Sequence, residues 1–494
     1  MANGGWQIIS AILYTMNFVL AIYAATSLIL RKHDPVKTLS WICVLILLPY
    51  IGLILYFFFG LNNRKKKMFS RKGFADLKAK KEISKVQREA IIKDPNILGK
   101  DLVAYKKIIL QNIKSGGTII ESNSKIDFYF TGRDALDAMY NSIQNAKKHI
   151  HLQSYIIEND NIGRKFAELL KQKATQGIEV RIIYDGLGSY KLSEEFIKNL
   201  TDAGVEMLCF SPVKLLALTS KLNYRNHRKI LVVDGEEGYL GGVNIADRYY
   251  YGNSVGDWHD THIKVRGESV KSLQLCFLLD RYFIKNHKIR RRKKYYPEID
   301  LPSSQNGTTS ESIFSQTIIS GPDSSWASIM QCYFSTITSA LNHIYIVTPY
   351  FTPNESILNA IKTAALSSID VRIMLPETSD SKISHYSTMS YISELLDAGV
   401  KIYLFKKGFN HSKVVSIDGK MSIVGSANMD VRSFEHNFET NALVYGNDLA
   451  LQVKEDFMND MQHCTLIDNL DEWRKRPLWH KMCESIVRLV SPVL

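Results

Sequence analysis

This chain of 494 residues has few cysteines and lacks the cysteine patterns that bind metals or carry redox chemistry. Its six cysteines are scattered and no C-x-x-C pair occurs, so neither a zinc site nor a disulfide framework is indicated. The sequence also contains no G-x-x-x-x-G-K-S/T loop and no H-E-x-x-H pattern, which argues against P-loop nucleotide hydrolysis and against a zinc protease. We therefore predict no metal site.

Two long stretches near the N-terminus lack charged residues altogether. Gln7–Leu30 is 24 positions without Asp, Glu, Lys, Arg or His, and Leu39–Gly60 is another 22. A helix that crosses a bilayer needs roughly 20 apolar residues. A cleaved signal peptide is the alternative for the first stretch, but Met1–Trp6 has no basic residue and a second stretch follows closely. We predict a two-span transmembrane anchor over residues 1–62.

The basic residues that flank these stretches predict an orientation. The connector Arg31–Thr38 holds three lysines and arginines, whereas Arg64–Lys72 holds six. Because basic loops stay on the cytoplasmic side, the larger cluster is expected there, and two spans return the chain to its starting side. The remainder of the chain is therefore expected in the cytoplasm, attached to a multi-pass anchor.

The net charge narrows the class of partner. Lys plus Arg number 62 and Asp plus Glu 49, so the formal net charge is +13. Such a balance favours nucleic acid, anionic lipid or a phosphate-bearing substrate. Two membrane spans make nucleic acid the weakest of these. Seven basic residues in Lys285–Lys294 form either a solvated helix face or a contact with anionic headgroups.

Beyond the anchor, the chain consists of a neck and two similar halves. Residues 63–120 read as a basic juxtamembrane neck, and the polar run Ser303–Ser312 as a linker. The segments on either side of this linker, 121–302 and 313–494, repeat each other. Examples are "FIKNLTDAGVEMLCF" with "YISELLDAGVKIYLF", "KKHIHLQSYI" with "LNHIYIVTPY", and "IEVRIIYDG" with "IDVRIMLPE". Short buried strands alternating with amphipathic helices predict an α/β fold, duplicated as a whole domain.

The clearest motif stands towards the end of each half. "NHRKILVVDGEEGYLGGVN" begins at Asn226 and "NHSKVVSIDGKMSIVGSAN" begins at Asn410, and both follow H-x-K-x(4)-D with a glycine-rich turn and a final Asn. The corresponding positions are His227 and His411, Lys229 and Lys413, Asp234 and Asp418, and Asn244 and Asn428. A single copy is compatible with a structural histidine. Two copies with identical spacing favour a paired catalytic site, formed by the histidine, lysine and aspartate of each copy.

This pattern suits the chemistry of a phosphate group. Each motif looks like strand, turn and strand, and side chains at i and i+2 of an extended chain share one face. Histidine and lysine then point the same way, so that the lysine neutralises oxygen charge while the histidine attacks or protonates. Gly241–Gly242 and Gly425–Ser426 leave room for backbone N–H groups, and Asn244 and Asn428 offer amide donors.

The paired motif resembles that of the phospholipase D superfamily. The whole chain, with its two N-terminal stretches, is similar to the bacterial cardiolipin synthase family, as are "WHDTH" at Trp258–His262, "VTPYFTP" at Val347–Pro353 and "RLVSPVL" at Arg488–Leu494. The resemblance implies two tandem αβα-sandwich halves with the active site at their interface. It also implies phosphodiester exchange through a covalent phosphohistidine, without a metal or organic cofactor.

The resemblance further implies roles for individual residues. His227 would be the nucleophile and His411 the acid/base, although the similarity of the two motifs leaves these roles interchangeable. The family places a carboxylate downstream of each histidine. The candidates are Glu439 in the second half and Asp260 in the first, with Asp257 as the alternative. Gly242 stands where the second half has Ser426, so the two phosphate cradles are expected to differ.

The resulting prediction is an enzyme of the bacterial cell membrane that joins two phosphatidylglycerol molecules into cardiolipin and glycerol. Its partners would be phosphatidylglycerol and other anionic lipids, without nucleic acid. A phospholipase D or another phosphatidyltransferase, such as the phosphatidylserine synthase type, is the alternative. A superfamily nuclease and a non-catalytic membrane scaffold are less well supported. Nothing in the sequence indicates an oligomeric state.

Overall fold

A computed structural model describes residues 2–30, 35–48, 50–56, 75–212, 224–254, 256–285, 292–298 and 313–490. The chain divides into two compact units, one of residues 1–68 with 213–223 and the other of residues 69–212 with 224–494. The basic cluster Arg64–Lys72, the linker Ser303–Ser312 and residues 286–291 of the basic tract lie outside the described residues.

The first unit contains the helices α1 (Ala2–Leu30), α2 (Pro35–Leu47) and α3 (Ile51–Leu55). Leu28 of α1 and Leu45 of α2 belong to one small cluster of buried side chains. Across the part of the chain that the structure describes, no helix combines the length and the apolar character needed to cross a membrane. The predicted two-helix transmembrane hairpin is therefore not confirmed.

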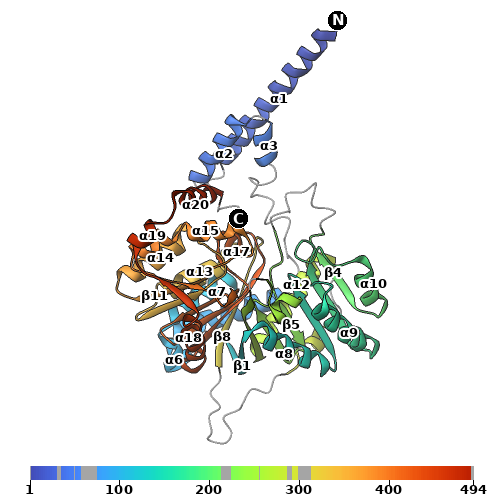
Figure 1. The fold of residues 1–494 in the computed structure, drawn as a ribbon. Coiled ribbons are helices and arrows are strands. Elements are labelled where there is room, and N and C mark those ends of the chain that lie inside the picture. The colour runs from blue at the N-terminus through green and yellow to red at the C-terminus, as the bar shows by residue number, and fades with distance from the viewer. Residues whose placement is uncertain are drawn as a thin grey trace, which may run out of the picture. The chain divides into compact units, whose positions relative to one another are not determined.

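The second unit is built around one long sheet that contains both repeats (Figure 1). The strands of the first half are β1 (Glu121–Thr131), β2 (His149–Ser154), β3 (Glu179–Asp185), β4 (Glu206–Phe210), β5 (Ile230–Val233), β6 (Glu237–Gly241) and β7 (Asp257–Gly267). Those of the second half are β8 (Ile313–Ser320), β9 (His343–Val347), β11 (Asp370–Pro376), β12 (Lys401–Phe405), β14 (Val414–Ile417), β15 (Met421–Gly425), β17 (Glu439–Tyr445) and β18 (Cys464–Ile467). Three short strands complete the set: β10 (Phe351–Thr352), β13 (Gly408–Asn410) and β16 (Met429–Asp430).

The strand order displays the duplication directly. It runs β4-β3-β2-β5-β6-β7-β1 through the first half and β8-β17-β15-β14-β9-β11-β12-β18 through the second. Strands β1 and β8 pair antiparallel, with Glu121 opposite Ser315, and so join the halves into one sheet. Corresponding strands occupy corresponding places on either side of this junction, which confirms the predicted duplication of an α/β domain.

Helices cover both faces of the sheet. In the first half they are α8 (Gly132–Gln144), α9 (Asn161–Thr175), α10 (Glu194–Asp202), α11 (Asp247–Tyr251), α12 (Glu268–Lys285) and the 3-10 turn η4 (Arg292–Tyr295). In the second they are α13 (Ser328–Ile337), α14 (Glu355–Leu366), α15 (Lys382–Met389), α16 (Ile392–Asp397), α17 (Val431–Glu435), α18 (Asn447–Met461), α19 (Leu470–Arg474) and α20 (Leu478–Val490). Successive strand residues point to opposite faces. Accordingly Leu231 of β5 packs in the core that contains α8 and α9, and Val232 packs in the core that contains α12.

The segment predicted as a neck is only partly separate from the halves. It contains α5 (Ala75–Lys93), η2 (Pro95–Leu98), α6 (Gly99–Val103) and α7 (Lys106–Gly116). Ile109 and Ile113 of α7 are buried in the same core as Ile329 and Tyr333 of α13. Burial of this apolar helix face attaches the end of the neck to the second half of the sheet.

The strand–turn–strand predicted for each motif is confirmed. Strands β5 and β6 pair antiparallel, as do β14 and β15. Asp234 and Asp418 open the two turns with φ of 56° and 54°, and Gly235 and Gly419 follow with φ of 74° and 62°. Asp and Gly are among the residues that tolerate this left-handed conformation best, which explains the Asp-Gly pair in both copies.

Candidate active site

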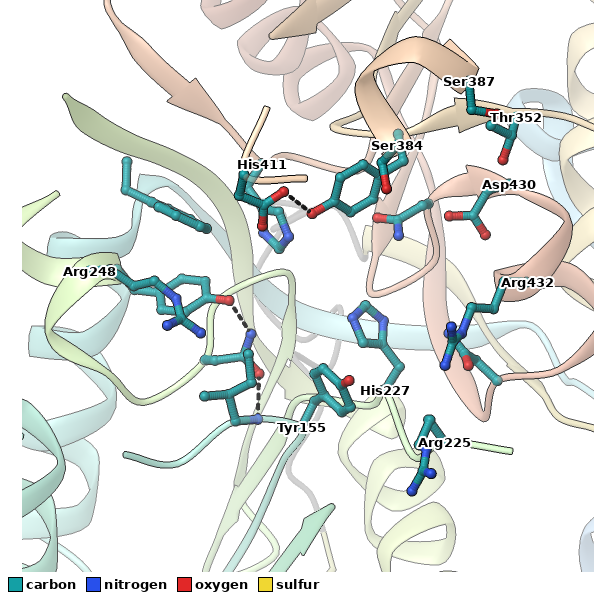
Figure 2. A pocket seen from close by; sticks show the side chains of 18 residues that line it. Tyr155, Arg225, His227, Arg248, Thr352, Ser384, Ser387, His411, Asp430 and Arg432 are labelled. Atoms are coloured by element: carbon teal, nitrogen blue, oxygen red, sulfur yellow. Dashed lines mark hydrogen bonds between the residues drawn. The ribbon is translucent and has the colours of Figure 1, made fainter. Parts of the chain in front are cut away.

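Both H-x-K segments lead into strands at the same place in the fold, one in each half. His227 and Lys229 directly precede β5, and His411 and Lys413 lie between β13 and β14. Both histidines line one cavity of about 320 Å³. Figure 2 shows their rings turned into this cavity from opposite halves of the sheet. The structure thus brings the two predicted histidines together in one pocket.

The lysines lie behind the histidines, within the protein. Lys229 Nζ donates to the carbonyl oxygen of His227 at 2.7 Å, and Lys413 Nζ donates to that of His411. Burial lowers the pKa of Lys229 to about 7 and that of Lys413 to about 8. An anion in the cavity would favour the charged form of both lysines, because opposite charges stabilise each other at short range.

Each histidine is held by a carboxylate from the other half. His227 Nδ1 is 3.0 Å from Glu439 Oε1, and His411 Nδ1 is 2.6 Å from Asp260 Oδ2. The sequence associates each carboxylate with the histidine of its own half, and this pairing is wrong. Asp257, the alternative to Asp260, is exposed at the start of β7, where it pairs with Gly408.

Backbone contacts between the halves cause this crossed pairing. The N–H of His227 donates to the carbonyl of Phe438 at 3.0 Å, and the N–H of His411 donates to that of His259 at 2.7 Å. Each H-x-K segment therefore lies alongside the carboxylate-bearing strand of the opposite half. In both halves the carboxylate belongs to the residue that directly follows this carbonyl, Glu439 or Asp260, and it reaches the imidazole across this contact.

The two imidazoles differ in what contacts their Nδ1 atoms. His227 Nδ1 faces two acceptors, the Glu439 carboxylate and the carbonyl oxygen of Ser426 at 3.1 Å. His411 Nδ1 faces the Asp260 carboxylate and also Lys413 Nζ, at 2.9 Å. Two acceptors require the proton of His227 on Nδ1, which leaves Nε2 with a free lone pair.

Burial shifts the charges of this group in a consistent direction. It lowers the pKa of His227 and brings that of His411 well below its ordinary value, and Lys413 contributes to the lowering at both. Burial raises the pKa of Asp260 to about 6. Burial raises the pKa of Glu439, but His227, Lys229 and the hydrogen bond from Ser426 together outweigh burial, so that the pKa is lowered. Neutral imidazoles beside an ionised glutamate are suited to nucleophilic attack and to proton transfer.

Ser426 and Gly242, which occupy the same position in the two motifs, contact the carboxylates that hold the histidines. Ser426 Oγ donates to Glu439 Oε2 at 2.5 Å. In the first half, a Cβ atom on Gly242 would stand 1.8 Å from Asp260 Oδ1. The predicted difference between the two phosphate cradles is therefore a difference in carboxylate support, because only glycine leaves room for Asp260.

The two motif asparagines lie at the cavity wall. Asn244 and Asn428 both line the cavity. Asn244 accepts from the N–H of Ile156 at 3.0 Å and donates to Tyr249 Oη at 2.5 Å, so its amide supports the wall. The backbone N–H of Asn428 donates to Ser433 Oγ at 3.2 Å.

Asp234 and Asp418 are not brought to the cavity. Each lies seven positions after its histidine, a span of about 23 Å in an extended chain at roughly 3.3 Å per residue. Asp234 accepts from the N–H groups of Lys147, Lys148 and His149 at 2.8, 2.6 and 2.9 Å. Asp418 accepts in the same way from residues 341, 342 and 343 at 2.8, 2.7 and 2.8 Å. The prediction that both aspartates are catalytic does not agree with this geometry, in which they bind backbone N–H groups.

We expect Asp234→Ala to destabilise the fold while leaving the chemistry of folded molecules intact. Loss of three hydrogen bonds to a carboxylate should cost about 2–4 kcal/mol, since three backbone donors lose their partner and that of His149 is buried. Thermal unfolding and activity per folded molecule are the measurements. Asp234→Asn is the matched control, because asparagine tolerates the same left-handed backbone. Abolished activity at unchanged stability would contradict the structural role.

Several cavity residues have no counterpart in the motif. They are Tyr155, Ile156, Arg225, Arg248, Tyr249, Trp258, Tyr350, Thr352, Asp380, Ser384, Ser387, Asp430, Arg432 and Asn437. Trp258 lies in "WHDTH", Tyr350 in "VTPYFTP" and Tyr155 in the repeated segment "KKHIHLQSYI". These three residues could have been found from the short patterns that contain them. Most of the remaining residues lie outside such patterns, and tertiary contacts bring them to the cavity.

Comparison with known proteins matches this architecture to one family. The family model described as "Cardiolipin synthase, PLD-like domain" matches residues 139–255 and 333–461, and one described as "Phospholipase_D-nuclease N-terminal" matches 19–60. A cardiolipin synthase of Alkalihalophilus pseudofirmus is 38% identical over 96% of this chain and 92% of its own length. One of Geobacillus kaustophilus is 38% identical over 100% and 96%. The crystal structure of phosphatidylserine synthase from Haemophilus influenzae shares the fold, with a TM-score of 0.59 at 14% identity, covering 79% of this chain and 100% of that one.

Proposed function

This chain belongs to the cardiolipin synthase family of phospholipase D-like proteins, and we propose that it transfers a phosphatidyl group between two phosphatidylglycerol molecules. The products would be cardiolipin and glycerol. The observation that supports this most directly is the shared cavity, where His227 and His411 face each other with Glu439 and Asp260 behind them.

In the first step, Nε2 of His227 attacks the phosphorus of the donor lipid. A nitrogen–phosphorus bond forms and the bond from phosphorus to the glycerol oxygen breaks. The anionic phosphodiester raises the pKa of His411 when it fills the cavity, so that His411 carries the proton that the departing alkoxide takes. The pair of acceptors at Nδ1 of His227 supports this assignment, because it keeps the Nε2 lone pair free. Lys229 and Lys413 would offset the negative charge that gathers on the phosphoryl oxygens.

In the second step, a hydroxyl of the acceptor phosphatidylglycerol takes the place of the departed glycerol. His411 accepts its proton, the oxygen attacks phosphorus, and the bond to His227 breaks. A group that first donates and then accepts a proton must tolerate both states of its ring. Contacts of His411 Nδ1 with both Asp260 and Lys413 support this role, because they offer an acceptor and a donor at one atom.

The same family supports a location at the bacterial cell membrane. Residues 19–60 match the N-terminal family model, and we propose that they contribute a multi-pass anchor with the catalytic halves in the cytoplasm. Helix α20 adds support from the catalytic unit. On one side of this helix, Arg488 Nη2 forms an ion pair with Glu394 Oε1 at 2.5 Å. The other exposes large apolar side chains, Leu478, Trp479, Met482, Ile486 and Leu489. Such a face is suited to the surface of a lipid bilayer.

Product analysis tests the proposed function. Purified protein supplied with labelled phosphatidylglycerol in liposomes should form cardiolipin and free glycerol, with little phosphatidic acid. Excess glycerol should drive the reaction backwards, because leaving group and acceptor are both primary alcohols. If phosphatidic acid is the main product under all conditions, water is the acceptor and the protein is a phospholipase D.

A further inference from the structure

A buried arginine near the nucleophile lacks hydrogen-bond partners. Arg225 lies two residues before His227 and is 1% exposed. Its three guanidinium nitrogens have no hydrogen-bond partner within the described ranges. Asp185 Oδ1 stands 3.7 Å from Nη1, too far for a hydrogen bond, and its carboxylate accepts from the backbone N–H groups of Leu187 at 2.9 Å and Asn226 at 3.0 Å. A guanidinium has five N–H donors, and buried donors need acceptors.

A second arginine reaches the same region from the other half of the protein. Arg432 belongs to α17, is half-buried and, together with Arg225, lines the cavity that holds the histidines. Its side chain forms no ion pair with a carboxylate of the described chain. Burial lowers the pKa of Arg225, Asp185 counteracts this, and the charge of Arg432 adds to the lowering. Two cations that repel each other across a cavity create a binding site for an anion.

The other charged side chains that line the cavity already have partners. In the view of Figure 2, Arg225 and Arg432 lie on the side of His227 that faces away from His411. The third cavity arginine, Arg248, is already paired with Glu158 at 2.8 Å. Of the lining carboxylates, Asp380 accepts from Tyr350 Oη at 2.7 Å and Asp430 accepts from the N–H of Ser433 at 2.6 Å. The unpaired positive charge is therefore concentrated at the end formed by Arg225 and Arg432.

We propose that Arg225 and Arg432 bind a second phosphodiester, the one that belongs to the acceptor lipid and does not react. This inference rests on the proposed function. An acceptor phosphatidylglycerol carries its own phosphate three carbons from the attacking hydroxyl, whereas glycerol and water carry none. Arginine forks match phosphate oxygens in pairs of hydrogen bonds. The site would therefore select a lipid alcohol over the two small competitors.

Two acceptors that differ in a phosphodiester test this. Wild-type protein is given labelled phosphatidylglycerol as donor, with either glycerol or glycerophosphoglycerol, the deacylated acceptor, in a pairwise competition. We expect wild type to prefer glycerophosphoglycerol. Arg432→Gln should lower transfer to glycerophosphoglycerol and formation of cardiolipin by about 10- to 100-fold, mainly through KM, because hydrogen bonds between charged groups are lost. Transfer to glycerol should stay within about twofold, since no second phosphate is present.

Controls separate binding from folding. Arg266→Gln removes the same charge from the exposed side of β7, away from the cavity, and should alter neither reaction. Arg225→Lys keeps a charge in the buried position and should lose part of the preference. Thermal unfolding identifies any variant that fails to fold. If Arg225→Lys fails to fold, Arg432→Gln alone tests the proposal.

Three outcomes would overturn the proposal. If Arg432→Gln lowered transfer to both acceptors equally, Arg225 and Arg432 would bind the reacting phosphate and not that of the acceptor. Unchanged preference would remove it from acceptor binding, and so would a wild type that treats the two acceptors alike. Failure of the proposed function is a separate result, because wild-type protein would then produce neither cardiolipin nor exchanged glycerol.

Discussion

Replacing either His227 or His411 by alanine should lower phosphatidyl transfer by about 10⁴-fold or more, and the double variant should be no worse than the weaker single one. Both side chains line one cavity, and each step of the exchange needs both of them. Residues that act as a unit are strongly non-additive, because removal of the first already abolishes the pathway that the second serves. Initial rates of cardiolipin formation from labelled phosphatidylglycerol provide the measurement.

His463→Ala is a suitable control for this experiment. His463 is exposed and lies just after α18, outside the residues that line the cavity. Its replacement should leave the rate unchanged, and all variants should unfold at similar temperatures. If each active-site variant retained about half of the wild-type rate and the double variant none, the two motifs would be independent sites. The shared-cavity mechanism would then be wrong.

Glu439→Gln should lower transfer by about 10²- to 10⁴-fold through its effect on His227, a histidine 212 residues away in the sequence. The amide can donate to Nδ1, and this would favour the tautomer that carries its proton on Nε2, the atom that must attack. In Ser-His-Asp hydrolases, replacing the carboxylate that orients the imidazole by its amide lowers the rate by about 10⁴-fold. Trapping of the phosphohistidine in acid-free quenched samples, together with the rate, measures the effect.

Asp260→Asn distinguishes the crossed pairing from pairing within each half. In the crossed arrangement, Glu439→Gln impairs the nucleophile, so little covalent adduct forms. Asp260→Asn impairs His411, so the adduct forms slowly and also breaks down slowly. A larger fraction of the protein should then carry the adduct than in Glu439→Gln. The reverse pattern would support pairing within each half and contradict the 3.0 Å and 2.6 Å contacts between the halves. Both substitutions conserve volume, which limits effects on packing.

The crossed pairing makes the halves depend on each other for more than a shared surface. His227 is bonded through its backbone to Phe438 and through its ring to Glu439, and both belong to the second half. His411 is bonded in the same two ways to His259 and Asp260 of the first half. Neither motif can therefore orient its imidazole without the other half in place, which provides a physical reason for retaining both copies in one chain.

Much of this architecture could be predicted from the sequence, because it depends on local patterns. The alternation of apolar residues around β5 and β14 specifies buried strands, and the Asp-Gly pairs at Asp234 and Asp418 specify the turns. Identical spacing in two copies indicated a duplicated domain and a pair of catalytic histidines. All of these signals connect residues a few positions apart, where backbone geometry alone relates sequence to structure.

Tertiary structure decided which groups meet. His227 and Glu439 are far apart in sequence, and only the lateral pairing of each H-x-K segment with a strand of the opposite half brings them together. The same pairing places Arg225 and Arg432 at one cavity wall, whereas Asp234, close to His227 in sequence, is carried away along an extended strand. Side-chain chemistry in the sequence therefore determined what the site contains. Which of these groups contact each other is decided by contacts between segments 151 and 212 residues apart, and these contacts depend on how the two halves of the sheet join.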